Sequence, residues 1–577
     1  MSLQYRKALA IAVAAVAGLW LVHAPPLAAL QIGAANPSRI LHFPSDRSIG
    51  TLYLKTDGEE WEVWTDAKGD IEVPQRKEAK LEISRSVPYS ELDALLGTVR
   101  ADCDLSPLDK LSAADLHSVV VESTNCVNAD LVHLASLTKL RQFSLPSSMT
   151  RLPITDAGLM YFKTMVSLEE LDLAGSSMTG LGLRYLGNLP RLATLKLNHS
   201  RLDEKELRNF VGFRSLTTLD ISGNQIAGPG LQSLAALTSL KSLDLSDVGL
   251  TDARLAYLSE LTSVEKLTLG NNQLTGQGFR YLVSLAERLR ELDLSSDPLT
   301  DGGLAQLAPF RALRTLRIFK ALITDSGLSF LKGMSALEHL ELIDTKASGT
   351  ALANLENARS LTSLTLWHSP ITDAGLAALP AQPSLKTLIL WHTRITDEGL
   401  KGIERFTGLT DLDLSDDNVT DAGVNALAKL HSLSVLRMSG TKITGRNLEA
   451  LTNLEDLDLD GTRVNDSGLI GKTWKKLRRL DVSGTNITDH GLASIGALET
   501  LEELDISATK ISDGGMAHIL NLKRLKTLRL DKTAVSDESI QFIESLPNLK
   551  ELWLSNTNVS AGALRRFKAR RPEINVL

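Results

Sequence analysis

Residues 361–400 decide the fold, and they read LTSLTLWHSPITDAGLAALPAQPSLKTLILWHTRITDEGL. Leu361 and Leu385 begin two copies of the pattern L-x-x-L-x-L, which lie 24 residues apart. In each copy the leucines first alternate, as in a short β-strand, and then recur at helical spacing behind Ile-Thr-Asp. This stretch therefore predicts a strand, a turn and a helix that repeat with a fixed period.

The same unit runs through most of the chain of 577 residues. About 19 copies follow one another between Leu116 and Leu549, almost always at the same interval. One unit cannot bury its own leucine face, so neighbouring units must stack and share a core. The repeat predicts an α/β solenoid over residues 116–577, a horseshoe with a concave parallel β-sheet, convex helices and a C-terminal cap.

Each position of the unit has an expected task. Counted from the first leucine, positions 4 and 6 point inward, and positions 3, 5 and 7 point toward the concave side. Thr-Asp, as in Thr372-Asp373, is typical of a helix start, because a short oxygen side chain accepts from the free N–H groups of the first turn. Threonine or asparagine at position 9 is expected to satisfy backbone groups where the strand ends.

These units resemble the leucine-rich repeat family, and the likeness covers roughly residues 105–577. The Ile-Thr-Asp-x-Gly-Leu segments, as in 371–376 and 487–492, look like the ribonuclease-inhibitor-like and cysteine-containing subtypes, although threonine replaces the repeated cysteine of the latter. The resemblance implies a protein-interaction horseshoe of exported bacterial type. It does not name a partner, because function belongs to the site and not to the fold.

The first 30 residues carry a targeting pattern. Arg6 and Lys7 precede an apolar run over 8–22, and Pro25-Pro26 ends it, which is the order of a secretory signal. The run is shorter than the ~20 residues of a spanning helix. We expect an exported protein, periplasmic, cell-surface or secreted, while cleavage of the signal and its retention as an N-terminal membrane anchor both stay open.

Residues 31–88 do not fit the repeat and alternate apolar and polar residues between turn signals, which predicts a small antiparallel β-module. Trp61 and Trp64 are expected in its core or at its seam with the solenoid, with a carbohydrate-binding role as the alternative. Residues 89–115 are expected to form a helical linker and N-cap, with a short helix over 90–96.

The only two cysteines, Cys103 and Cys126, fall at corresponding corners of adjacent units. Adjacent units stack closely enough for a bond, and an exported protein permits oxidation. We expect a disulfide that staples the N-terminal cap, with two buried thiols as the alternative.

Large apolar residues at position 7 mark the candidate site. This position is small or polar in most units, but four consecutive units carry Phe319, Ile343, Trp367 and Trp391. Neighbouring strands should stack them into a stripe ~15 Å long. The predicted partner-binding residues are these four together with a charged rim of Arg317, Lys320, Asp344, His368 and His392. Exposed aromatic residues of this kind anchor protein interfaces, and the alternative is that the rings pack on one another.

Other chemistry has weaker support. Asp344, His368, His392 and Asp416 have the residue types of a metal site, but a straight row of one residue per strand seldom converges on one point. Carboxylates that recur at position 5 follow the repeat template and are expected to coat the concave face. No catalytic motif and no cofactor motif occurs in the chain.

These patterns predict a non-enzymatic, monomeric recognition protein with a protein partner. The formal charge of −7 opposes nucleic acid as the partner. Two alternatives stay open: an intracellular substrate adaptor that resembles the F-box leucine-rich-repeat proteins, and a carbohydrate-binding or enzymatic activity in the β-module.

Overall fold

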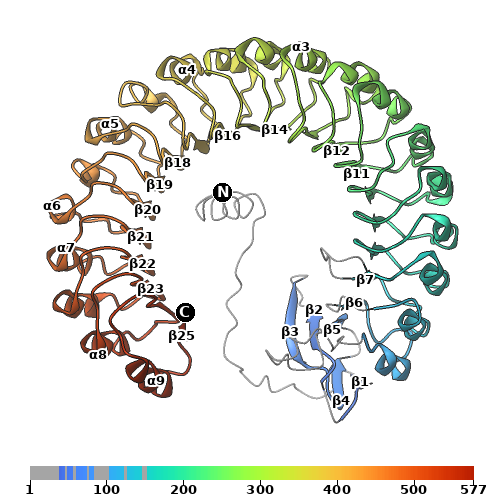
Figure 1. Ribbon diagram of the computed structural model, residues 1–577, viewed down its shortest axis with the longest axis horizontal. Coiled ribbons are helices and arrows are strands. Elements are labelled where there is room, and N and C mark those ends of the chain that lie inside the picture. Colours follow the sequence, from blue (N-terminus) through green and yellow to red (C-terminus); the bar gives the residue numbers. More distant parts are fainter. Residues whose placement is uncertain are drawn as a thin grey trace.

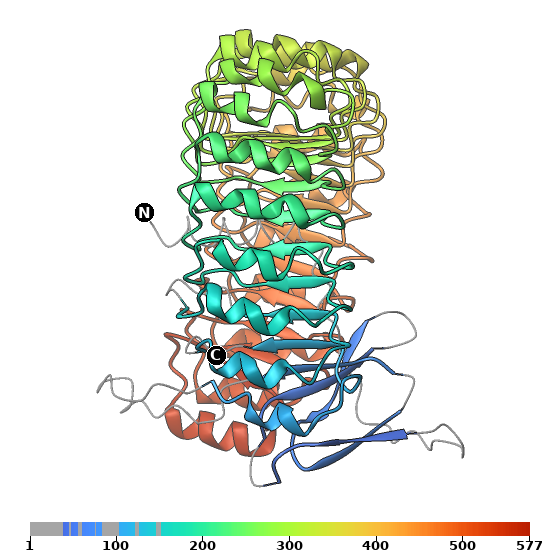
Figure 2. The same cartoon turned by 90° about the vertical axis from the view of Figure 1, so that its right-hand side faces the viewer.

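The computed structural model describes residues 38–45, 48–55, 60–74, 77–83, 103–121, 126–145 and 152–577. The chain winds into a horseshoe that completes most of a circle, with strands on the inside and helices on the outside (Figure 1). A view from the side shows the units stacked as parallel layers, with the N-terminal strands at one end (Figure 2).

The concave face is a single parallel sheet in which each unit adds one strand. Pairing is in register, so Leu340, Leu364 and Leu388 lie side by side on neighbouring strands. The strands of the horseshoe are β6 (Ser118–Val121), β7 (Gln142–Ser144), β8 (Glu170–Asp172), β9 (Thr194–Lys196), β10 (Thr218–Asp220), β11 (Ser242–Asp244), β12 (Lys266–Thr268), β13 (Glu291–Asp293), β14 (Thr315–Phe319), β15 (His339–Ile343), β16 (Ser363–Thr365), β17 (Thr387–Ile389), β18 (Asp411–Asp413), β19 (Val435–Arg437), β20 (Asp456–Asp458), β21 (Arg479–Asp481), β22 (Glu503–Asp505), β23 (Thr527–Arg529), β24 (Glu551–Trp553) and β25 (Asn575–Val576).

The convex segments are short, and most of them are 3-10 helices, where the leucine spacing predicted helices without distinguishing the two types. Each holds only a few residues between the strand end and the next strand, so i→i+3 bonding replaces a regular α-helix. The 3-10 helices are η1 (Ser106–Lys110), η2 (Asp130–Leu134), η3 (Asp156–Phe162), η4 (Leu181–Tyr185), η5 (Glu204–Gly212), η6 (Pro229–Ala236), η7 (Asp252–Leu258), η8 (Gln277–Leu285), η9 (Ala305–Leu307), η10 (Asp325–Gly333), η11 (Thr350–Asn357), η12 (Ile403–Arg405), η13 (Leu448–Ala450), η14 (Asp513–Asn521) and η15 (Asp537–Ser539). The α-helices are α3 (Asp301–Leu304), α4 (Asp373–Ala378), α5 (Asp421–Leu427), α6 (Asp466–Leu469), α7 (Asp489–Ile495), α8 (Ile540–Glu544) and α9 (Ala561–Arg570).

Where threonine and aspartate start a convex segment, the two side chains have different partners. The Thr372 hydroxyl accepts from the Gly375 N–H, as a helix cap does. Asp373 instead reaches the next unit, where its two oxygens accept from the Thr396 N–H at 2.8 Å and the Thr396 hydroxyl at 2.7 Å. We call this bond from one unit's aspartate to the next unit's threonine or serine the aspartate stitch. It joins successive units along the convex edge.

Glycine behind the stitch lets the units approach one another. A Cβ atom on Gly375 would lie 2.2 Å from the Ser348 carbonyl oxygen of the preceding unit. Only glycine avoids such a clash. Along the inside, the leucines of all units form one continuous buried core, which extends from Leu41 to Ile574.

The polar residues at position 9 bond to the backbone where the strand ends. The Asn224 amide donates to the carbonyls of Leu197 and Ile221 at 3.0 and 2.9 Å, and the Thr441 hydroxyl donates to the Met438 carbonyl at 2.7 Å. This confirms the expected role of position 9.

The N-terminal strands extend the concave sheet. Strands β1 (Ser38–His42) and β4 (Asp70–Pro74) pair with each other, while β2 (Thr51–Lys55) pairs antiparallel with β3 (Trp61–Asp66) and β5 (Ala79–Ile83). Because β5 then pairs in parallel with β6, the antiparallel sheet is the first part of the horseshoe sheet. The larger sheet has β3 at one edge and β25 at the other.

The expectation for Trp61 and Trp64 was wrong in the case of Trp64. Strand β3 lies at the sheet edge, with little packed against it, so Trp64 is 44% exposed and Val63 is 68% exposed. Trp61 is half-buried against the Lys80 ammonium group.

Several sequence predictions lie outside the described residues, namely the signal over 1–30, the helix over 90–96 and the domain boundaries near 30 and 88. In the described part of the chain, no helix has both the length and the apolar character to cross a membrane.

Candidate functional site

A left-handed turn at position 8 ends the strands of the solenoid from β8 to β24. From the unit that begins at Leu168 onward, this residue always has a positive φ, whether it is Gly461 (64°), Asp416 (56°) or His368 (57°). Its N–H donates to the position 7 carbonyl of the next unit, as His368 does to Trp391 at 2.9 Å. Glycine, asparagine and aspartate adopt this conformation most readily, which explains why they recur here.

Position 5 carries carboxylates that bond within their own unit. Asp293 accepts from the N–H and hydroxyl of Ser295 at 2.9 and 2.6 Å, and Asp481 does the same with Ser483 at 2.8 and 2.6 Å. The recurring Asp-x-Ser is therefore a structural bond across the concave surface, although its carboxylate still contributes negative charge there.

The four apolar residues of position 7 do form a continuous stripe, and we call it the aromatic stripe: Phe319, Ile343, Trp367 and Trp391. Trp367 stacks on Trp391 with ring centroids 5.0 Å apart, and the Phe319 ring lies 6.1 Å from Trp367. Phe319 and Trp367 stand two strands apart, so their rings lean toward each other over the strand of Ile343. The stripe is a packed unit rather than four separate side chains.

Burial divides the members of the stripe. Trp367 is only 6% exposed because its neighbours cover it, contrary to the expectation that all position 7 side chains face solvent. Phe319, Ile343 and Trp391 remain half-buried and form the accessible surface. Leu322, which the sequence reasoning missed, is another accessible apolar side chain of the same unit: this residue follows the turn after Phe319 and is 71% exposed.

The predicted rim residues contact one another, the stripe or, in the case of Arg317, a neighbouring glutamate. Arg317 binds Glu341 at 3.1 Å, and the Lys320 ammonium lies 5.0 Å from the Phe319 ring centroid. Burial raises the pKa of Glu341, and the Arg317 guanidinium opposes that shift. The rim thus places a positive guanidinium and a positive ammonium beside the first ring of the stripe.

The histidines extend this network on the other side. His368 Nδ1 lies 3.0 Å from Asp344 Oδ1, and the rings of His368 and His392 stack at 5.1 Å. Asp416 accepts from the indole N–H of Trp391 at 3.0 Å. Each aspartate therefore has its own separate partner, and Asp344, His368, His392 and Asp416 do not come together as a metal-ligand group among the described residues.

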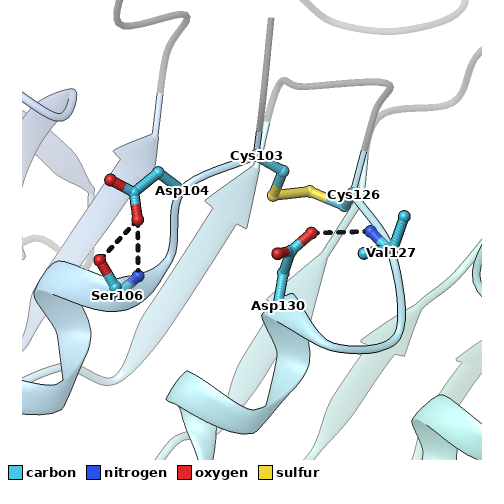
Figure 3. The surroundings of a disulfide bond; sticks show 6 residues. All are labelled: Cys103, Asp104, Ser106, Cys126, Val127 and Asp130. Carbon is cyan, nitrogen blue, oxygen red and sulfur yellow. Dashed lines mark hydrogen bonds between the residues drawn. A yellow bond between two sulfur atoms is a disulfide. The ribbon is translucent and has the colours of Figure 1, made fainter. Parts of the chain in front are cut away.

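The two cysteines lie at the N-terminal end of the solenoid (Figure 3). A bond joins their sulfur atoms, and their Cα atoms are 4.8 Å apart. Asp130 is also close, but its carboxylate accepts from the Val127 N–H at 2.8 Å and so closes the local turn. This geometry fits the expected staple of the cap, and the oxidised state in solution stays a prediction.

Comparison with known families identifies the repeat. Residues 166–226 match the family model described as Leucine rich repeat, and residues 381–403, 475–496 and 497–520 match a second model described as Leucine Rich repeat. The chain carries leucine-rich repeats and has the corresponding solenoid fold. No curated protein matches the sequence.

Among solved structures, many chains share the fold at low identity. A leucine-rich-repeat protein of Leptospira interrogans is 19% identical, with 85% of this chain and 100% of that chain covered and a TM-score of 0.39. The ectodomain of the Arabidopsis receptor kinase HAESA, solved with a peptide hormone ligand, is 20% identical over 80% of this chain and 78% of that chain, with a TM-score of 0.42. A plant peptide hormone receptor, solved in complex with RGF2, is 16% identical over 81% and 88%, with a TM-score of 0.38.

Proposed function

We propose that this chain is a non-enzymatic recognition protein that binds a partner protein on its concave sheet, around Phe319, Ile343 and Trp391. The observation that carries the proposal is the aromatic stripe itself. It interrupts position 7 of the concave surface, which is otherwise small, polar or acidic. Large aromatic residues in such a setting supply much of the binding energy of protein interfaces.

The packing of the stripe supports binding rather than opposing it. Trp367 is buried beneath its neighbours and holds the Trp391 ring in a fixed position. A ring that is already fixed loses little conformational entropy when a partner covers it. Arg317, Lys320, Asp344, His368 and His392 would form the polar rim of this interface, and no cofactor enters the proposal.

We further propose that the protein acts outside the cytoplasm as a monomer. The basic and apolar pattern of residues 1–30 and the bonded pair Cys103 and Cys126 support export. Residues 38–83 contain strands, whereas an F-box is helical, so the adaptor alternative gains no support from the described residues.

Substitution of the exposed rings tests the proposal. Phe319→Ser combined with Trp391→Ser installs the common residue of position 7 and removes most of the accessible apolar surface. We expect capture of the partner by the full chain to fall by at least about 100-fold, because two interface anchors are lost. The measurement is affinity capture with quantitative mass spectrometry.

A matched control keeps the test specific. Trp553→Ser removes a tryptophan from the same sheet in the last unit, far from the stripe, and is expected to leave capture unchanged. Circular dichroism should be the same for all variants, because these side chains lie outside the leucine core. Undiminished capture by the Phe319 and Trp391 variant would place the site elsewhere.

A further inference from the structure

The aromatic stripe lies in a stretch of the sheet with little net charge. On β16 and β17 the outward strand positions hold serine, threonine and isoleucine, and the nearest charged pair before them is Arg317 with Glu341. Directly after Trp391, the character of the sheet changes. Asp411 and Asp413 on β18 begin an acidic flank, which continues to β23.

The acidic flank has many more carboxylates than cations. Over β18 to β23 with their position 7 residues, positions 3, 5 and 7 contain nine acidic residues and three arginines. Arg437 binds Asp411 at 2.9 Å, Arg479 binds Glu503 at 3.0 Å, and Arg529 lies 3.8 Å from Asp505. Asp458 and Asp481, in the middle of the flank, have no ion pair among the described residues. The flank therefore has an excess of carboxyl groups over cations beside the stripe.

The neighbouring cations do not correct this excess. Lys442, Arg463 and Lys510 lie at position 10, beyond the turn that ends the strand, and none of them forms an ion pair with a strand carboxylate in the described residues. The Lys442 ammonium instead donates to the Asn418 side chain at 2.8 Å. The acidic surface and the aromatic stripe are thus adjacent and continuous on the same sheet.

The pKa values of two aspartates in the acidic flank are raised. Burial raises the pKa of Asp458 to about 6, with Asp460 and Asp413 adding to the shift and Arg437 opposing it. Burial and the charges of Asp505 and Asp458 raise the pKa of Asp481 well above its usual range. Burial and the neighbouring carboxylates disfavour the ionised form of these groups, so a cation that reaches them would stabilise that form.

We propose that the partner presents a cationic segment, in which an apolar side chain packs on Phe319, Ile343 and Trp391 and lysine or arginine side chains extend over Asp413, Asp458 and Asp481. This inference rests on the proposed function and adds the chemistry of its partner. The sheet supplies both features at one place, so a single extended segment that crosses the strands can use them together.

The strand spacing sets the length of that segment. From β17, beside Trp391, to β21 with Asp481 there are four strand intervals, which is ~19 Å at ~4.8 Å per interval. An extended chain covers this distance with about six residues. The apolar residue and the farthest useful cation should therefore lie about six residues apart.

The experiment uses synthetic peptides and the full chain. The probe is a peptide of about twelve residues with a Trp-Leu pair at one end and lysines spread over the remainder, together with its reversed sequence. Two control peptides replace the lysines by glutamate or the Trp-Leu pair by serine. Calorimetry at low and moderate salt gives the affinity, and buffers of different ionisation enthalpy give the protons released.

Three variants of the protein separate the contributions. Asp458→Asn with Asp481→Asn should weaken binding of the lysine peptide by at least about 10-fold and reduce proton release. Asp220→Asn with Asp244→Asn removes two position 5 carboxylates from the other half of the sheet and should change affinity less than about 3-fold. Trp391→Ser should lower the affinity for the lysine peptide that carries Trp-Leu. It should not change the affinity for the control peptide in which serine replaces Trp-Leu.

The outcomes distinguish this inference from the proposal beneath it. If Trp391→Ser weakens binding while the Asp458 and Asp481 variant does not, the stripe stands as a site and the cationic partner is wrong. If neither variant weakens binding, both ideas fail. Equal losses from the two aspartate pairs, or saturable binding of Ca²⁺ alone that the Asp458 and Asp481 variant abolishes, would also overturn the cationic segment.

Discussion

At the level of the single residue, two carboxyl groups, those of Asp417 and Asp297, are buried where their ionised form is unfavourable. Asp417 stands at position 9, where other units place threonine or asparagine, and is 3% exposed. One of its oxygens accepts from the N–H and hydroxyl of Thr393 at 2.8 and 2.9 Å, while the other has no partner among the described residues. Burial raises the pKa of Asp417 to about 8, and the charges of Asp413 and Asp416 add to the shift. Asp297 repeats this arrangement in an earlier unit.

The position of Asp417 predicts a stability that falls with rising pH. The folded protein keeps this carboxyl protonated up to about pH 8, whereas the unfolded chain releases the proton near pH 4. The free energy of unfolding contributed by Asp417 is therefore greatest below about pH 4 and is lost as pH rises to about 8. Asp417→Asn should raise the free energy of unfolding at pH 9 by roughly 2 to 4 kcal/mol, with a smaller effect at pH 5.

Urea unfolding at the two pH values measures this difference. The matched control is Asp416→Asn, which changes the neighbouring exposed aspartate and retains an oxygen that accepts from Trp391. Equal stabilisation by Asp417→Asn at pH 5 and pH 9 would contradict a protonated carboxyl at this position.

At the level of the element, the aspartate stitch defines many of the convex segments as much as their own helices do. Asp397 accepts from the N–H and hydroxyl of Thr420 at 2.8 and 2.6 Å and from the Gly423 N–H at 3.0 Å. The Thr420 N–H lies at the N-cap of α5 and the Gly423 N–H lies in its first turn, where a helix supplies no i−4 acceptor of its own. One carboxylate thus caps the next unit's helix and links two units.

Removal of one stitch should loosen one joint of the solenoid. Asp397→Ala removes the acceptor of the Thr420 N–H and hydroxyl and one of the two acceptors of the Gly423 N–H, so we expect the free energy of unfolding to fall by about 2 to 3 kcal/mol. Hydrogen exchange at the amides of Thr420 and Gly423 should accelerate, while the equivalent amides of Thr444 stay protected by Asp421. Asp397→Asn keeps one acceptor oxygen, so its exchange rates should lie between those of the wild type and of Asp397→Ala. Unchanged exchange in Asp397→Ala would refute the stitch.

The sequence predicted the elements well because their cause is periodic. Leucines such as Leu364 and Leu388 recur at one spacing, and that spacing determines both the strand and its register. Glycine at position 8, as in Gly440 and Gly461, indicates a left-handed turn. Because other units carry residues such as His368 there, the sequence did not reveal that the turn is common to these units. The stitch was missed because the Thr-Asp pair fits a helix start within one unit equally well.

The site was predictable in part. The four residues of the aromatic stripe stand at the same position of consecutive units, so in-register pairing of the strands must place them side by side. The burial of Trp367 was not, because it depends on how the Phe319 and Trp391 rings lean, which residue spacing does not determine. Leu322 was missed because it lies beyond the strand, outside the columns that the repeat aligns.

At the level of the whole molecule, the two ends of the horseshoe have different closures (Figure 1). The C-terminal end is covered by α9, which buries Phe567, and by β25. At the N-terminal end the antiparallel strands continue the sheet, and Cys103 and Cys126 join the first convex turns. The sulfur bridge is thus part of the cap and lies far along the chain from the stripe.

Loss of the bridge should weaken the N-terminal end alone. The bonded cysteines are separated by 23 positions, and closing such a loop restricts the unfolded chain by about 3 kcal/mol. Cys103→Ser with Cys126→Ser should therefore accelerate hydrogen exchange in β6 but not in β24. Mass spectrometry after alkylation provides the decisive check: reaction of both thiols in native, unreduced protein would show that the bridge is absent.

The joints between units have an evolutionary consequence, because each aspartate stitch and each shared strand pair connects a unit only to its immediate neighbour. A duplication or deletion of 24 codons would insert or remove one complete joint and create no new kind of contact. Such an event between β7 and β14 would move the aromatic rings relative to the N-terminal cap by one strand spacing, ~4.8 Å. The number of repeats therefore sets the distance between the aromatic stripe and the N-terminal cap, and gene duplication can increase that distance in equal steps while the scaffold stays the same.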